Sequence, residues 1–175
     1  MTCLVVLLLS WLSIAGVRAA EDEFTAIGFR YQIREPLGPK GIPRDDSGDI
    51  FLEFGLLPMI SIRTGLEYAS YEIPILGMNP SEDLEELIFS ATIRYYKATG
   101  RVRYFGSFGF GIFYEEREIN AETIRDADLG LMVGGGVELT LGRHFGLEFE
   151  TLLESSGGRE PDSVLVFAVG PKFFF

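Results

Sequence analysis

Hydrophobic and polar residues alternate with a period of two along most of the chain. From Phe24 onward the alternation recurs in eight segments, each setting an apolar row against glycine, small polar and charged residues. Side chains of a β-strand point alternately to its two faces, so this pattern predicts strands rather than helices. The predicted strands are 24–34, 49–57, 60–71, 86–97, 102–115, 127–140, 144–154 and 163–175.

The connections between these strands alternate between short and long. Tight breaks fall at Pro58-Met59, at 98–101 and at 141–143. The other connections are longer and polar, at 35–48, 72–85, 116–126 and 155–162. Short turns at one end and longer loops at the other are typical of an up-and-down transmembrane barrel. The sequence therefore predicts an all-β fold, an eight-stranded antiparallel up-and-down transmembrane β-barrel.

The polar face of the predicted strands carries charges of both signs, diluted by glycine. Six basic and six acidic residues alternate onto this face: Arg30, Arg34, Arg63, Arg94, Arg103, Lys172, Glu53, Glu67, Glu115, Glu138, Glu148 and Glu150. Balanced charges suit the lumen of a narrow barrel, where buried ions must be paired. We predict a lumen charge network of Arg30, Glu53, Arg63, Glu67, Arg94, Arg103, Glu138, Glu148, Glu150 and Lys172.

The opposite face is almost free of charge and rich in Phe, Leu, Ile, Val and Tyr, so we expect it to face lipid. Tyrosines near the long-loop ends and aromatic residues near the turn ends fall where girdles form at the two membrane interfaces. These residues are Tyr31, Tyr68, Tyr71, Tyr114, Phe24, Tyr95, Tyr104, Phe145 and Phe173. A secreted or periplasmic soluble β-barrel is the alternative, because alternation alone does not decide which face is wet.

The N-terminus has the features of an export signal. The apolar run 3–17 precedes Val17-Arg18-Ala19-Ala20 and an acidic segment, so we predict a signal peptide at 1–20 and a barrel domain at 21–175. The only cysteine, Cys3, lies in this run, so the mature chain would form no disulfide. Removing Arg18 with the signal leaves 26 acidic and 14 basic residues, a net charge of −12. That balance argues against a nucleic-acid partner.

Three stretches resemble strand–turn–strand segments of small Gram-negative outer-membrane β-barrel proteins of the OmpA/OmpX-like type. They are GLLPMISIRTGLEY (55–68), YFGSFGFGIFY (104–114) and GLMVGGGVELTLGRHFGLEFE (130–150). The chain end resembles that family's C-terminal assembly signal, with Phe167, Val169, Phe173 and Phe175 in alternation. The resemblance implies insertion by the outer-membrane assembly machinery and contact with outer-membrane lipid and lipopolysaccharide. It also implies periplasmic termini, with the longer loops outside; we expect a monomer.

Candidate catalytic and metal-binding residues are few. The one histidine, His144, follows the third tight turn with no serine two residues on, which disfavours a Ser–His hydrolase. Glu148 and Glu150 could act as acid and base, but the equal number of basic residues favours ion pairs. Residues 45–49, DDSGD, are the best calcium candidate without matching EF-hand spacing, and a solvated turn is the favoured interpretation. We therefore predict no catalytic residue, metal or cofactor.

These features predict a non-enzymatic protein with a charge-plugged lumen and a structural or surface-interaction role through its extracellular loops. A narrow channel or hydrophobic-solute conduit is the first alternative, and a lipid-modifying outer-membrane enzyme is the second.

At the chain end, Pro171 falls on the lipid face of the strand that must close the barrel. Because proline lacks the N–H that a sheet ladder needs, we expect a β-bulge there.

Overall fold

The computed structural model describes residues 25–37, 45–74, 81–119, 122–157 and 163–175. The predicted signal peptide lies outside these ranges. The described residues form eight strands: β1 (Thr25–Pro36), β2 (Asp45–Leu57), β3 (Ile60–Pro74), β4 (Ser81–Thr99), β5 (Val102–Ile119), β6 (Glu122–Thr140), β7 (Phe145–Ser156) and β8 (Ser163–Phe174). No helix within them is long and apolar enough to cross a membrane.

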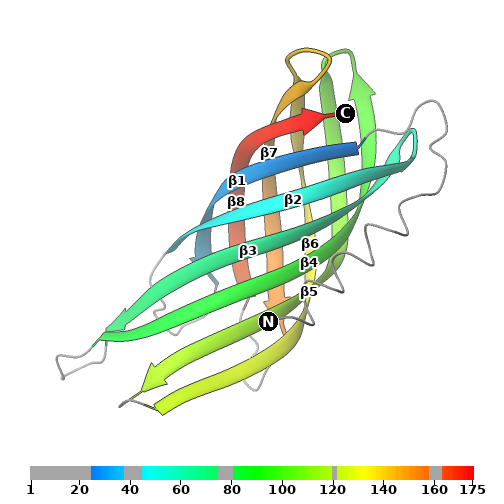
Figure 1. Cartoon of the computed structure of the whole chain (residues 1–175). Helices are drawn as coiled ribbons and strands as arrows, with labels where there is room; N and C mark the ends of the chain where they lie inside the picture. Colours follow the sequence, from blue (N-terminus) through cyan, green and yellow to red (C-terminus); the bar gives the residue numbers. More distant parts are fainter. Residues whose placement is uncertain (1–24, 38–44, 75–80, 120–121, 158–162) are drawn as a thin grey trace.

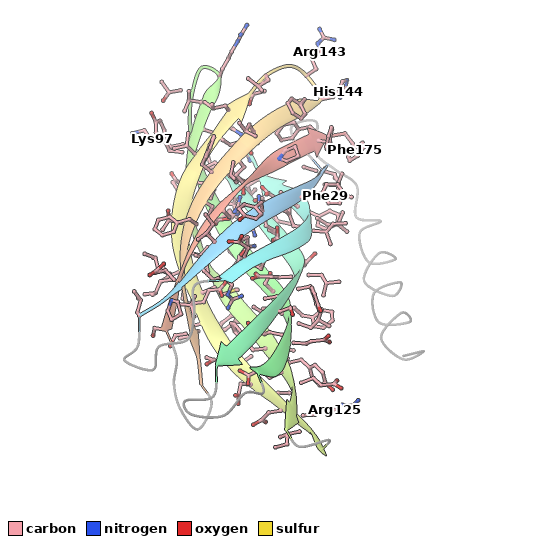
Figure 2. The ribbon with its side chains drawn as sticks, turned by 90° about the vertical axis from the view of Figure 1, so that its left-hand side faces the viewer. Phe29, Lys97, Arg125, Arg143, His144 and Phe175 are labelled. Carbon is pink, nitrogen blue, oxygen red and sulfur yellow. The ribbon has the colours of Figure 1, made fainter. Side chains whose placement is uncertain are left out.

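The strands form one closed barrel in sequence order, and every neighbouring pair is antiparallel. Figure 1 shows β1 lying beside β8, which closes the sheet on itself. This architecture confirms the predicted fold class. The three tight turns and the C-terminus share one end, here called the turn end. Lys97, Arg143, His144 and Phe175 lie there, whereas Arg125 lies at the other end (Figure 2).

The period-two pattern sorts side chains between two faces, as the sequence predicted. Inward-facing Arg94 and Lys172 have exposed fractions of 0%, whereas outward-facing Ile93 and Phe173 are 57% and 41% exposed. Glycines give the large interior side chains room. A Cβ on Gly28, for example, would overlap the ring of Phe51. The narrow lumen therefore depends on small residues opposite large ones.

Several predicted loops are in fact strands. The predicted loop 116–126 belongs to β5 and β6 apart from residues 120–121, and the predicted loop 72–85 is shortened at both ends by β3 and β4. Residues 45–49, the calcium candidate, start β2, and Asp49 is buried. Cross-strand pairing extends beyond the segments in which apolar residues alternate. The strands therefore include charged residues that the hydrophobic pattern assigned to loops.

The lengthened hairpins form a projection at the end opposite the turns, which we call the flap. It comprises residues 70–74 of β3, 81–86 of β4, 114–119 of β5 and 122–128 of β6. Within the described residues β2 pairs with β3 only as far as Ala69, and β7 pairs with β6 only from Gly130 onward. The flap is therefore an open four-stranded sheet that extends past the rest of the barrel (Figure 1).

The bulge expected at Pro171 is wrong. β7 pairs with β8 without a shift through Leu147 and Pro171. On the β1 side, Gly28 pairs with Lys172 and Tyr31 with Val169, so the register is the same on both sides of two skipped positions. No residue is inserted, because β1 advances by three residues from Gly28 to Tyr31 and β8 by three from Val169 to Lys172. The missing proline N–H is accommodated by a local interruption of the ladder rather than by a bulge.

Candidate functional site

The barrel interior contains the largest concentration of charged side chains among the described residues, in two clusters. The larger cluster, which we call the plug, contains Arg30, Asp49, Glu53, Arg63, Arg94, Arg103, Glu138, Glu148, Glu150 and Lys172. These residues come from every strand of the barrel. Five are basic and five are acidic, so the plug has no net formal charge.

Glu148 accepts hydrogen bonds from two arginines of the opposite wall. Arg63 donates from Nη1 to Oε1 at 2.7 Å and from Nη2 to Oε2 at 2.5 Å, and Arg94 Nη1 donates to Oε2 at 2.9 Å. Strands β3 and β4 supply the arginines, and β7 supplies the carboxylate. These bonds span the lumen, and they tie walls that do not pair in the sheet. Charge-assisted bonds of this kind are among the strongest in proteins.

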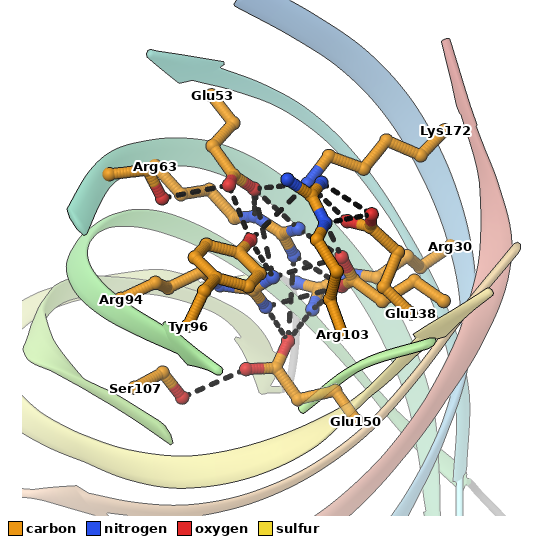
Figure 3. Close-up of polar contacts among 12 residues, drawn as sticks. Arg30, Glu53, Arg63, Arg94, Tyr96, Arg103, Ser107, Glu138, Glu150 and Lys172 are labelled. Carbon is orange, nitrogen blue, oxygen red and sulfur yellow. Dashed lines mark hydrogen bonds and ion pairs between the residues drawn. The ribbon is translucent and has the colours of Figure 1, made fainter. Parts of the chain in front are cut away.

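Glu53 and Glu138 hold the only lysine of the plug. Lys172 Nζ donates to an oxygen of each carboxylate at 2.8 Å. Glu53 also accepts from Ser61 Oγ at 2.7 Å and from the hydroxyl of Tyr96. Figure 3 shows these groups converging beside Arg63 and Arg94. Lys172, three residues from the chain end, is therefore bonded to β2 and β6 at once.

Glu150 completes the plug on the other side of Glu148. Its carboxylate pairs with Arg30 and Arg94 and accepts a hydrogen bond from Ser107 Oγ at 2.9 Å. Glu148 and Glu150 are thus both held by arginines, as the ion-pair interpretation predicted. Guanidinium groups also lie over interior rings. Arg63, for example, is 3.6 Å from the centroid of Phe51, and Arg94 is 4.0 Å from that of Phe105.

The second cluster lies nearer the flap, where Arg34 faces three carboxylates. Arg34 donates to Glu67 at 2.5 Å, and its Nη2 lies 3.2 Å from Glu86 Oε2 and 3.1 Å from Glu154 Oε2. Ser47 Oγ also donates to Glu67 at 2.8 Å. Among the ion pairs between described residues, these three carboxylates share one guanidinium, whereas basic and acidic residues are equal in number in the plug.

Glu154→Gln is expected to raise the free energy of unfolding by about 1 kcal/mol, the contribution of one hydrogen bond. Glu154 is 1% exposed, and neither carboxylate oxygen accepts a hydrogen bond. A neutral amide would remove the repulsion between Glu154 and the other carboxylates that share Arg34, and it could donate to one of them. Urea titration of the barrel folded in lipid vesicles would measure the change. A loss of stability would show that Arg34 already compensates all three carboxylates.

Sequence reasoning missed several interior residues. Asp49 and Glu86 fell within or beside predicted loops, and Glu154 ended the alternation of its strand. An apolar cluster of Ile88, Phe113 and Met132 also faces the lumen, although the polar face was expected to hold charged and small residues. The inward direction of these side chains could have been predicted by continuing the period of two along each strand.

A small cavity lies inside the barrel. A cavity of about 10 Å³ lies between the plug and the second cluster, lined by Arg30, Arg63, Arg94, Glu67 and Glu154 among others. That volume holds about one water molecule. Among the described residues no group of three or more His, Cys, Asp or Glu is placed to hold a metal ion.

His144 lies at the turn end, away from these clusters. Its Nδ1 is 3.1 Å from the backbone oxygen of Phe174. The residues of the predicted assembly signal lie on β8 and at the chain end. Phe167, Phe173 and Phe175 point outward with exposed fractions of 47%, 41% and 78%, and the Phe173 ring packs 5.4 Å from that of Phe145.

The fold is that of the small outer-membrane β-barrel proteins. Solved structures with this fold include Neisserial surface protein A, NspA, which is 13% identical over 90% of this chain and 100% of that one, with a TM-score of 0.68. OprG of Pseudomonas aeruginosa is 12% identical over 88% of this chain and 96% of that one, with a TM-score of 0.62. A third is Ail, the attachment invasion locus protein of Yersinia pestis, in complex with the heparin analogue sucrose octasulfate. It is 12% identical over 87% of this chain and 97% of that one, with a TM-score of 0.60. No protein-family model matches the sequence, and no curated protein sequence matches it.

Proposed function

We propose that this protein is a non-enzymatic integral protein of the bacterial outer membrane that contacts external molecules through its flap. The observation that carries the proposal is a lumen closed by the plug beneath a sheet that projects beyond the barrel. Ion pairs that cross the lumen, with a cavity beside them that has room for about one water, disfavour a channel or a solute conduit. The flap then remains as the distinctive surface.

The outer face supports a location in a membrane. Its exposed side chains are large and apolar on every wall of the barrel, including Phe29, Ile93, Phe108, Leu131, Phe149 and Phe167. Soluble proteins rarely expose contiguous apolar surfaces of this extent. Barrels with this fold expose such a band to lipid. Outer-membrane lipid, including lipopolysaccharide, is therefore a partner that we propose, and the assembly machinery is another.

The flap also bears on the kind of external partner. Glu85 and Glu116 are directly opposite each other on β4 and β5, and Arg125 of β6 pairs with Glu116 at 3.2 Å. Like charges opposite each other in a sheet repel. Although the Ail structure contains a sulfated ligand, an acidic flap disfavours an anionic polysaccharide here. We propose protein surfaces as the partners of the flap.

Cysteine labelling on intact cells tests this arrangement. Because Cys3 is the only cysteine in the chain, Arg125→Cys and Arg143→Cys each add a single thiol to residues 21–175. Both arginines are exposed, at opposite ends of the barrel. We expect a membrane-impermeant maleimide to label Arg125→Cys on intact cells. Arg143→Cys should react only after the outer membrane is permeabilised.

Labelling of Arg143→Cys on intact cells would reverse the proposed orientation, and recovery of the protein in the soluble fraction would contradict the membrane location. Planar-bilayer recording of the unmodified barrel provides the control for the closed lumen, where we expect no conductance steps. Steps that disappear when Arg63 or Arg94 is neutralised would instead support a channel.

A further inference from the structure

An open groove of about 440 Å³ crosses the outer face of β6, β7, β8 and β1. Its floor contains Gly135 and Thr151, two small outward-facing residues that are directly paired between β6 and β7. Rings form its sides: Phe149, Phe167 and Tyr31 have exposed fractions of 45%, 47% and 48%. The groove is therefore a hollow in the apolar outer face, created where side chains are small.

The sheet register gives the groove a linear shape. Gly135 pairs with Thr151, Thr151 with Phe167 and Phe167 with Ile33, so the residues lie in one row across four strands. Three strand spacings of about 4.8 Å each make the row about 14 Å long. One leaflet of a bilayer has a hydrocarbon thickness of about 15 Å, half of the whole core. The groove thus has the length of one lipid tail.

The lining side chains are apolar or uncharged on the outer surface. Glu150 also borders the groove, but its carboxylate points into the plug, where the residue is 4% exposed. The groove is continuous with the apolar face that we place in lipid. Lipid hydrocarbon is therefore the material that surrounds its opening. A linear, apolar and laterally open hollow fits an acyl chain better than a compact solute.

We propose that this groove binds one acyl chain of a membrane lipid and holds it in place against β6–β8. The inference rests on the proposed membrane location. Lipid tails elsewhere on the barrel meet protruding side chains such as Leu66 and Ile93, whereas a tail in the groove contacts a floor and two walls. The larger contact retains that lipid longer than its neighbours.

Photo-crosslinking tests the site with a defined probe. The full barrel is folded in phosphatidylcholine vesicles that contain a phospholipid with a photoreactive diazirine on one acyl chain, and crosslinked residues are mapped by mass spectrometry. We expect severalfold more crosslinks at Phe149, Thr151 and Phe167 than at Leu66 and Ile93. Thr151→Trp, which fills the floor, should remove this excess.

Thr64→Trp is the matched control, since Thr64 is an outward-facing threonine on β3, outside the groove. This variant should leave the excess crosslinking unchanged. Equal crosslinking around the barrel would overturn the groove site, and so would a protein dimer crosslinked through β7. Absence of acyl crosslinks at every position, with the barrel folded, would instead contradict the proposed membrane location.

Discussion

Glu148→Gln is expected to lower the free energy of unfolding by about 3–5 kcal/mol, because it leaves buried cations without their partner. Glu148 accepts four hydrogen bonds from Arg63 and Arg94, and its own exposed fraction is 0%. A neutral amide keeps the shape of the side chain and removes the charge that both guanidinium groups face. Urea titration in lipid vesicles, followed by heat-modifiable migration on a gel, would measure the loss.

Two control variants separate this effect from the substitution itself. Glu154→Gln makes the same change on the same strand, yet there the expected effect has the opposite sign because Glu154 shares Arg34 with two other carboxylates. Glu116→Gln removes a carboxylate from an exposed pair with Arg125 and should change stability little, since surface pairs are screened by water. Equal losses at Glu148 and Glu154 would refute the distinction between a carboxylate held by two arginines and one that shares a single arginine.

Gly170→Ala is expected to destabilise the closed barrel by about 3 kcal/mol, at the upper end of overpacking costs. A Cβ on Gly170 would overlap the backbone oxygen of Phe29 and lie 2.8 Å from Arg30 Cα. These atoms belong to β1, so the added methyl group would push apart the two strands that close the sheet. The yield of heat-modifiable, folded barrel would fall, together with its midpoint in urea.

The control for this prediction is Gly142→Ala. Gly142 lies between β6 and β7 at the turn end, where an added Cβ would meet nothing within 4 Å. The same methyl group should therefore have little effect there. If both variants fold equally well, β1 and β8 must separate slightly without cost. The close approach at Gly170 would then have no energetic consequence.

The alternation of side chains was sufficient to predict the barrel because the period of two assigns each residue to a face. Arg63, Arg94, Glu148 and Lys172 all face the interior for that reason alone. Which of them touch could not be predicted, since contacts across the lumen join strands that do not pair. Arg63 and Glu148, for example, are 85 residues apart in the chain.

The ends of the strands were predicted less well than their centres. The flap contains acidic residues such as Glu85 and Glu116, which are unfavourable in isolated strands and were assigned to loops. Pairing with an adjacent hairpin overrode that preference. Pro171 shows the same limit, because the sequence reveals a missing N–H but not how the neighbouring ladder adjusts to it.

The distribution of interior charge by strand has a consequence for how the barrel closes. Among the described residues, the two strands that meet last in a sheet built in sequence order carry only cations inside: Arg30 and Arg34 on β1 and Lys172 on β8. Their neighbours carry only carboxylates: Asp49 and Glu53 on β2, and Glu148, Glu150 and Glu154 on β7. An open sheet leaves each set short of partners across the gap. Joining β1 to β8 brings these cations and carboxylates into contact. The ion pairs therefore stabilise the closed barrel only in the register that places them opposite one another.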